Sequence, residues 1–333
     1  MRYLLFAAKI ALSVTLVVYA FSMIDTAEAM LQMRTISAYA VLVTAGLLFL
    51  QSSVAAYRLR QVLEALGVRC RFLRALDAVF VGAFFSQTLI SFVGGDAMRI
   101  LRIVRSNVPL ANATKAVVVD RAVGLAGTIG LVLVTLPFLL EVVTEPTMRN
   151  GFLIALVGGI VGLVAVVSLG YLPAALRRVK LLHWTSEIVR MTFSAVWSAK
   201  RLASLLAVSL IIQLFNVITL YVLALGLSIN LTFWHSLLLV PPVLFISMLP
   251  ISVAGWGVRE GAMIVALGLV GVPPARSVAL SVCFGLSLIA ISLPGAVLWL
   301  LQGGHAIRRA PDVDAPSVAP GERGHRSGGH DGP

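Results

Sequence analysis

Charged side chains are scarce in this chain, and cysteine is scarcer still. Of 333 residues, 12% are charged and 59% are hydrophobic, and the mean hydropathy is +0.99. A soluble domain of this size needs a far more polar surface, so the composition excludes one and indicates an integral membrane protein. The two cysteines, Cys70 and Cys283, offer neither a disulfide framework nor the spacing of a metal site.

The sequence also lacks the motifs that usually mark catalytic and cofactor sites. It contains no phosphate-binding loop, no nucleophile elbow and no cluster of metal ligands. No cofactor and no nucleic-acid partner are therefore predicted. An enzyme that modifies a lipid within the membrane stays an alternative, because Asp96, Asp120 and Glu260 could supply carboxylates for acid–base chemistry.

Apolar runs of about 20 residues, the length that an α-helix needs to cross the hydrocarbon core, predict an all-α polytopic membrane protein. Basic residues gather in three segments, 58–74, 177–201 and 308–326. By the positive-inside rule these segments are loops or tails that face the cytoplasm. Both termini are therefore predicted to be cytoplasmic.

One apolar run conflicts with this topology if it crosses the membrane. Residues 78–93 have basic clusters at both ends, so a single crossing would put one cluster outside. A re-entrant hairpin that enters from the cytoplasm, turns at Gly94 and Gly95 and returns along 97–108 keeps both clusters inside. The mirror argument predicts a second hairpin over 233–271, broken at 250–257.

The two predicted hairpins lie at corresponding places in two halves of the chain. Ile-Ser-Phe-Val-Gly-Gly-Asp-Ala-Met-Arg at 90–99 returns, altered, as Ile-Ser-Val-Ala-Gly-Trp-Gly-Val-Arg at 251–259. Each half reads helix, re-entrant hairpin, helix, which predicts an inverted repeat. The prediction is a transmembrane domain over 1–305 with about six full spans and two re-entrant hairpins, its repeats covering about 36–140 and 202–301. A disordered cytoplasmic tail over 306–333 follows.

Helices that break at membrane depth persist only beside protein or a water-filled cavity, so the two turns predict a polar chamber. The helix N-termini that follow the turns would favour an anionic group such as a lipid phosphate. The candidate substrate-binding residues are those at the turns and the charged residues near them: Gly94, Gly95, Asp96, Arg99, Asp120, Arg121, Ser252, Gly255, Gly257, Arg259 and Glu260.

Arg121 lies about 18 Å along a helix that is predicted to begin at Pro109, at a depth where an ionisable group is costly. It either binds a lipid headgroup while a carboxylate, Asp96 or Glu260, holds it, or it forms a structural ion pair and extends to the interface. Asp96 could instead be only the N-cap of the next helix. Glu260 could be a helix cap, or a site residue that takes up and releases a proton.

Arg99, Arg102 and Arg105 recur every third residue, opposite apolar side chains. This spacing predicts a short basic amphipathic helix at the membrane surface. Anionic lipid is its natural partner, and topology anchoring is the simpler alternative.

At these residues the chain resembles the lysylphosphatidylglycerol synthase transmembrane family, as a stand-alone member without the synthase domain. The most specific pieces are Gly-Gly-Asp-Ala-Met-Arg at 94–99, Val-Pro-Leu at 108–110, Asp-Arg-Ala-Val-Gly-Leu at 120–125 and Ile-Ser-Val-Ala-Gly-Trp-Gly-Val-Arg-Glu-Gly at 251–261. The resemblance implies a flippase of the bacterial inner membrane that moves an anionic or modified phospholipid or a lipid-linked glycan between leaflets. It also implies that the family's motifs mark the positions of five charged residues, Asp96, Arg99, Arg121, Arg259 and Glu260. The alternative function is an accessory role in a glycolipid or hopanoid pathway. Besides the membrane lipid, the candidate partners are a second copy of the chain and a lipid-synthesis enzyme.

Overall fold

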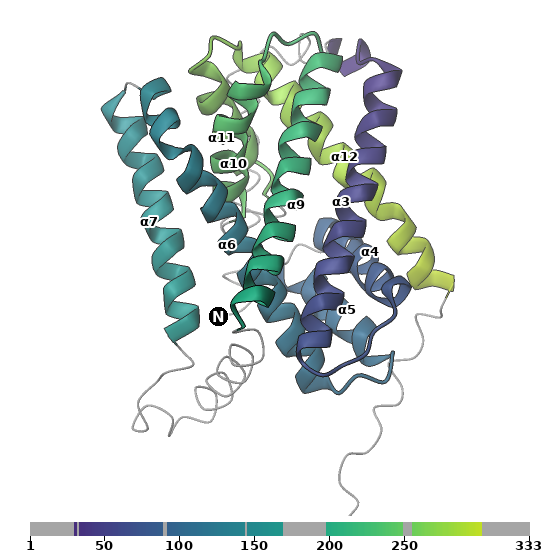
Figure 1. Cartoon of the computed structure of the whole chain (residues 1–333). Helices are drawn as coiled ribbons and strands as arrows, with labels where there is room; N and C mark the ends of the chain where they lie inside the picture. The colour runs from purple at the N-terminus through teal and green to yellow at the C-terminus, as the bar shows by residue number, and fades with distance from the viewer. Residues whose placement is uncertain are drawn as a thin grey trace, which may run out of the picture.

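The computed structural model describes residues 30–301 except 32, 89–91, 144, 169–197 and 249–254, and within these ranges it contains helices and no β-strand. The all-α fold that the sequence predicts is thus confirmed. The helices are α3 (Ala38–Ala65), α4 (Phe72–Thr88), α5 (Phe92–Val104), α6 (Leu110–Val142), α7 (Pro146–Ser168), α9 (Ala199–Gly226), α10 (Phe233–Ser247), α11 (Val258–Gly268) and α12 (Pro274–Leu301) (Figure 1). The first of the predicted spans, over residues 3–24, and the predicted tail over 306–333 lie outside the described residues.

Four of these helices, α3, α6, α9 and α12, are long and apolar enough to cross a membrane. Their outer faces carry large apolar side chains, and Leu42, Val134 and Leu300 are 73%, 70% and 66% exposed. Polar side chains such as Thr128 and Gln213 are buried instead. This distribution is that of a protein surrounded by lipid, so the chain is a multi-pass membrane protein.

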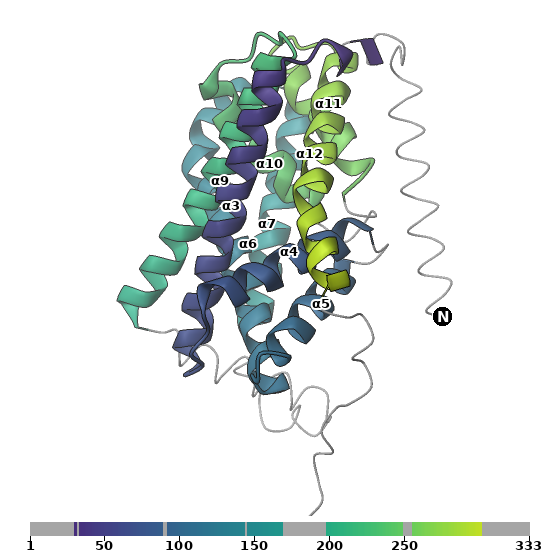
Figure 2. The same ribbon diagram turned by 90° about the vertical axis from the view of Figure 1, so that its right-hand side faces the viewer.

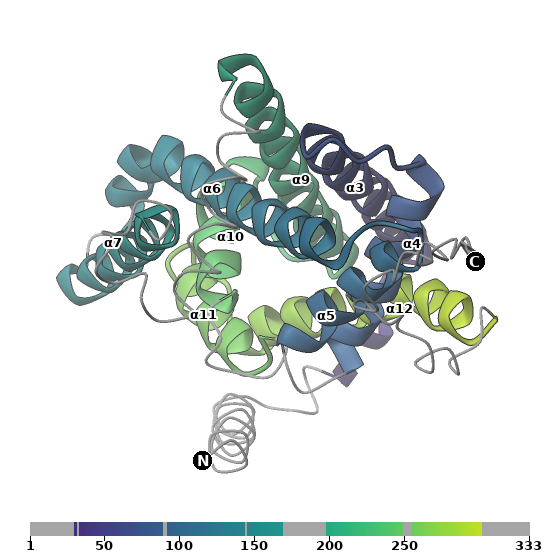
Figure 3. The ribbon, with the colours of Figure 1, turned by 90° about the horizontal axis from the view of Figure 1, so that it is seen from below.

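Helices α3 and α9 lie side by side and antiparallel along the molecule (Figure 1, Figure 2). At one end the amide of Ser37 donates a hydrogen bond to the carbonyl of Gly226 at 3.2 Å. Toward the other end Gln61 Nε2 donates to Ser204 Oγ at 3.1 Å. The first helices of the two predicted repeats therefore run in opposite directions. Helix α7 lies at the periphery, against α6 (Figure 3).

Each region that the sequence predicts as a hairpin contains two short helices that pack against each other. Helices α4 and α5 have 17 and 13 residues, and α10 and α11 have 15 and 11. At about 1.5 Å per residue, none of them is long enough to cross roughly 30 Å of hydrocarbon. Figures 1 and 2 show α4 and α5 in the lower half of the molecule and α10 and α11 in the upper half.

Two apolar cores accompany these two pairs of short helices. In one, Leu63, Val79 and Ile103 are buried with residues of α6. In the other, Leu239 and Met263 are buried with residues of α9 and α12. The burial of apolar side chains thus fixes each short pair against the long helices of the bundle.

The structure corrects the boundary between α3 and the loop after it. The sequence predicts that 58–74 is a basic loop, but α3 continues to Ala65 and Arg58 is only 8% exposed. Gly67 lies just after the end of the helix and has a φ of 77°. The amide of Val68 there donates to the carbonyl of Leu63 at 2.9 Å, as in a glycine-terminated helix end.

The prediction that Gly94 and Gly95 form a turn is wrong. Both residues lie inside α5, as does Asp96, which is therefore not the N-cap of that helix. Gly95 is a packing residue, because a Cβ there would overlap the side chain of Ser86 and the carbonyl oxygen of Gly82 in α4. The missing side chain lets the two short helices approach closely.

In the second half, the glycines do lie in a turn. Gly255 and Gly257 have φ values of 80° and 85°, in the left-handed region that glycine adopts most easily. Helix α11 begins directly after them, at Val258. Ser252 lies outside the described residues.

Candidate functional site

Asp120 of α6 is the centre of a buried cluster of charges. Its Oδ1 accepts a hydrogen bond from Arg58 Nε of α3 at 2.8 Å, and its Oδ2 accepts one from Arg99 Nη1 of α5 at 3.2 Å. Asp120 is 3% exposed, and the two arginines are 8% and 9% exposed. One carboxylate thus serves two guanidinium groups from two other helices, which fixes α3, α5 and α6 against one another.

Small residues make room for Arg58 in this cluster. A Cβ at Gly124, one turn along α6 from Asp120, would lie 3.2 Å from the guanidinium group. Arg58 Nη1 also donates to Ser209 Oγ of α9 at 2.9 Å. Arg58 therefore ties α3 to both α6 and α9.

Arg121 and Asp96 form a second ion pair that is more open to its surroundings. Arg121 Nε lies 3.0 and 2.9 Å from the two carboxylate oxygens, and Arg121 Nη2 lies 2.7 Å from Oδ1. The two side chains are 39% and 19% exposed. The structure thus pairs Arg121 with one of the two carboxylates that the sequence offers, and Asp120, its neighbour in the chain, faces other partners.

Together these five side chains carry three positive charges and two negative charges, so one positive charge is in excess. The arginine side chain is a planar donor whose geometry matches a phosphate group. The arrangement can therefore present guanidinium groups to an anion inside the membrane domain. Within the described ranges, no group of three or more His, Cys, Asp or Glu side chains is placed to hold a metal ion.

The prediction that α5 is a basic helix at the membrane surface is wrong for two of its three arginines, which are buried. Arg99 binds Asp120, and Arg102 donates to the carboxylate of Asp77 in α4 at 2.9 and 2.6 Å. Arg102 is 4% exposed, whereas Arg105 is exposed. The regular spacing locates the charged face of α5, but that face meets carboxylates of neighbouring helices.

Arg259 and Glu260 form a separate buried cluster at the start of α11. Glu260 accepts hydrogen bonds from the amide of Gly257 at 2.5 Å, from Ser281 Oγ at 2.8 Å and from Arg259 Nη2 at 3.0 Å. The guanidinium group of Arg259 lies 4.8 Å from the centre of the Trp256 ring, within the range of a cation–π contact. Glu260 thus has the capping role that the sequence offers as one alternative, and its arginine is Arg259 rather than Arg121.

Uncharged polar side chains continue from the Asp120 cluster between α3, α6 and α9. Gln213 Nε2 donates to Thr128 Oγ1 at 2.5 Å, and Asn216 Nδ2 donates to Gln213 Oε1 at 3.1 Å. Gln51 Nε2 then donates to Asn216 Oδ1 at 2.8 Å. This row links the two halves of the chain through the membrane domain.

Arg58 and Asp77 take part in these ion pairs but are not among the site residues predicted from the sequence. A signal for Arg58 does exist, because Thr44, Gln51 and Arg58 recur every seven residues and so share one face of a helix. Asp77 has no comparable signal, since it is the only acidic residue of a largely apolar segment.

The chain matches a family model described as "Lysylphosphatidylglycerol synthase TM region" over residues 6–295, a range that contains both charged clusters. A comparison with curated proteins gave no match. The model covers more than half of the chain, and the resemblance in the sequence motifs is therefore confirmed. The chain belongs to the lysylphosphatidylglycerol synthase transmembrane-region family, whose membrane domain is associated with lipid-related functions.

Proposed function

We propose that this protein moves an anionic or modified phospholipid, or a lipid-linked glycan, between the leaflets of the bacterial inner membrane. The observation that carries the proposal is the partly exposed Arg121–Asp96 pair beside the buried Asp120 cluster. Each charge at the centre of a spanning helix costs about 2.5–3.5 kcal/mol on the insertion scale. A set of five charged groups with an excess positive charge therefore favours an anionic ligand over a purely structural role.

The two ion pairs have different roles in this mechanism. The Asp120 cluster is almost fully buried and joins three helices, so it provides a rigid base. Arg121 and Asp96 are more exposed, so a lipid phosphate can compete with Asp96 for the guanidinium group. When the headgroup leaves, the ion pair forms again. The arginine is thus paired before and after each transfer, which limits the cost of a charge at membrane depth.

We further propose that the domain is an inverted repeat of helix, re-entrant hairpin, helix, with halves α3–α6 and α9–α12. The antiparallel α3 and α9 and the position of the short pairs at opposite ends support this arrangement (Figure 1). The helix contacts support it as well. When each helix is exchanged for its counterpart in the other half, α3 for α9, α4 for α10, α5 for α11 and α6 for α12, helix pairs that pack together map onto other pairs that pack together. Thus α4–α12 becomes α10–α6, α3–α6 becomes α9–α12, and α3–α12 becomes α9–α6. A site between two such halves can open to one leaflet and then to the other.

The distribution of basic residues supports an orientation for this domain. Among the described residues, the segment between α3 and α4, the start of α4 and the start of α9 carry most of the exposed basic side chains, and Figure 1 shows these segments in the lower part of the molecule. By the positive-inside rule we assign this end to the cytoplasm, with both termini on the same side.

Leaflet exchange of a fluorescent phosphatidylglycerol in proteoliposomes tests the proposed transport. Arg121→Ala and Asp96→Asn should each slow the exchange by about tenfold or more, equivalent to at least about 1.4 kcal/mol in the rate-limiting step. Arg149→Ala is the matched control, since Arg149 is exposed at the start of α7, and it should exchange lipid at the wild-type rate.

Each variant is first shown to insert and to elute as wild-type protein from a sizing column. Wild-type exchange rates in both site variants would reject Arg121 and Asp96 as the site. A wild-type protein that exchanges none of several anionic lipids would reject transport itself and favour the accessory role.

A further inference from the structure

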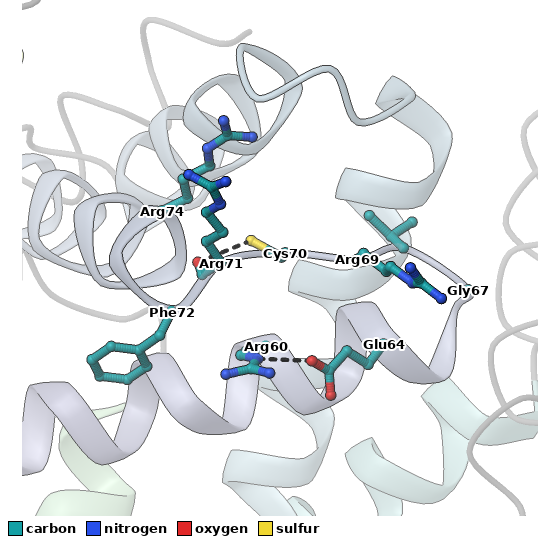
Figure 4. A pocket seen from close by; sticks show the side chains of 9 residues that line it. Arg60, Glu64, Gly67, Arg69, Cys70, Arg71, Phe72 and Arg74 are labelled. Atoms are coloured by element: carbon teal, nitrogen blue, oxygen red, sulfur yellow. Dashed lines mark hydrogen bonds and ion pairs between the residues drawn. The ribbon is translucent and has the colours of Figure 1, made fainter.

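A separate pocket lies at the end of α3, and none of its lining residues belongs to the two charged clusters. It is an open hollow with a volume of about 940 Å³, bordered by the last turns of α3, the segment that follows and the first turn of α4. Its charged lining consists of Arg60, Glu64, Arg69, Arg71 and Arg74 (Figure 4). This volume is in the range of pockets that hold small ligands.

Local backbone structure holds the pocket in shape. Gly67, two residues after the end of α3, has a φ of 77°, and its amide donates to the carbonyl of Glu64 at 3.1 Å. The chain then reverses, and Val68 and Phe72 pack against the apolar core of this end of the molecule. The arginines that follow Gly67 are therefore carried on a fixed turn opposite the last turns of α3.

The charge of the pocket is strongly positive, with four arginines against one glutamate. Arg60 Nε donates to Glu64 Oε1 at 2.7 Å, which neutralises one arginine. Within the described part of the chain, the side chains of Arg69, Arg71 and Arg74 make no ion pair. Figure 4 shows the side chains of Arg71 and Arg74 extending in the same direction in this view. Such a group of uncompensated guanidinium groups in a concave surface attracts phosphate.

We propose that this pocket binds a phosphate group, carried either by an anionic phospholipid of the adjoining leaflet or by a soluble phosphate ester. The neighbouring surface favours the lipid, because Leu73 lies between two lining residues in the chain and is 73% exposed. A headgroup in the pocket would place its acyl chains beside such apolar side chains. The site does not depend on the transport proposal, since it can bind lipid whether or not Arg121 and Asp96 move one.

Binding to the full-length protein in neutral detergent distinguishes these sources. The probes are dihexanoyl phosphatidylglycerol, dihexanoyl phosphatidylcholine and glycerol 3-phosphate, titrated at low salt and followed by microscale thermophoresis. The double variant Arg71→Gln/Arg74→Gln removes two exposed charges, and Arg34→Gln/Arg149→Gln is the control because it removes two exposed charges elsewhere. We expect phosphatidylglycerol to bind the wild type and the control equally and to bind the pocket variant about tenfold more weakly.

The soluble probe identifies the source of the phosphate. Glycerol 3-phosphate that binds as tightly as phosphatidylglycerol, and loses affinity in the pocket variant, assigns the pocket to a soluble ester. Binding of phosphatidylglycerol alone assigns it to the membrane lipid. Equal affinity of the pocket variant and the wild type for every probe overturns the proposal, as does an equal loss in the control. Sizing columns show that the variants are folded.

Discussion

Replacing Asp120 by asparagine leaves two arginines buried without the charge that they share. Asparagine has nearly the same shape, so the change removes the charge and little else. Arg58 and Arg99 are 8% and 9% exposed and cannot reach water by small movements of their side chains. The variant therefore isolates the electrostatic contribution of the cluster to the stability of the folded domain.

The expected loss follows from the burial of the partners. Removing one member of a buried ion pair costs about 3–5 kcal/mol, because the other charge stays buried and unpaired. Here the change affects two pairs, but the remaining amide oxygen still accepts one hydrogen bond, so we expect a loss of about 4 kcal/mol in the free energy of unfolding. By contrast, Glu64→Gln breaks a pair whose side chains are 45% and 40% exposed. That change should cost less than about 1 kcal/mol.

Unfolding in mixed micelles of maltoside and dodecyl sulfate, followed by tryptophan fluorescence, measures both changes. Adding Arg58→Met to Asp120→Asn removes one of the unpaired charges and should restore part of the lost stability, which a purely steric defect would not permit. An Asp120→Asn protein that is as stable as Glu64→Gln would refute the electrostatic reasoning.

Two further predictions concern particular residues. Gly95→Ala should destabilise the protein by about 1–3 kcal/mol, because its Cβ would overlap Ser86 and Gly82; Gly130→Ala, where the space is open, should be neutral or stabilising in the same unfolding assay. Burial raises the pKa of the Cys70 thiol above its usual value of 9.0, while Arg74 and Arg60 lower it. Since only the thiolate reacts, alkylation of Cys70 in a Cys283→Ser protein should accelerate as the pH rises toward and through 9, and Arg74→Gln, which raises the pKa further, should slow it at pH 8. An unchanged rate in Arg74→Gln would show that this guanidinium group does not act on the thiol.

The class of the protein and most of its long helices could be predicted because apolar length is a local property of the sequence. Pro109 marks the start of α6, which begins at Leu110. Arg121 could be assigned a carboxylate from another segment, because neighbours on a helix point in different directions. These features follow from one segment of the sequence, whatever helices that segment packs against.

The predictions that failed concern residues whose environment depends on the neighbouring helices. The spacing of Arg58 from Thr44 and Gln51 indicates a shared helix face, but its partner, Asp120, lies 62 residues further on and cannot be read from that spacing. Gly95 looks like a turn residue until the side chain of Ser86 is placed against it. In both cases the residue type is compatible with two environments, and tertiary packing decides between them.

The headgroup dependence of leaflet exchange tests the central claim most directly. Phosphatidylglycerol and phosphatidylcholine with the same fluorescent chain are compared in proteoliposomes of the wild type, Arg121→Ala and Arg149→Ala. We predict that the wild type and Arg149→Ala exchange phosphatidylglycerol faster than phosphatidylcholine, and that Arg121→Ala loses this preference. A preference for phosphatidylglycerol that persists undiminished in Arg121→Ala would contradict the account.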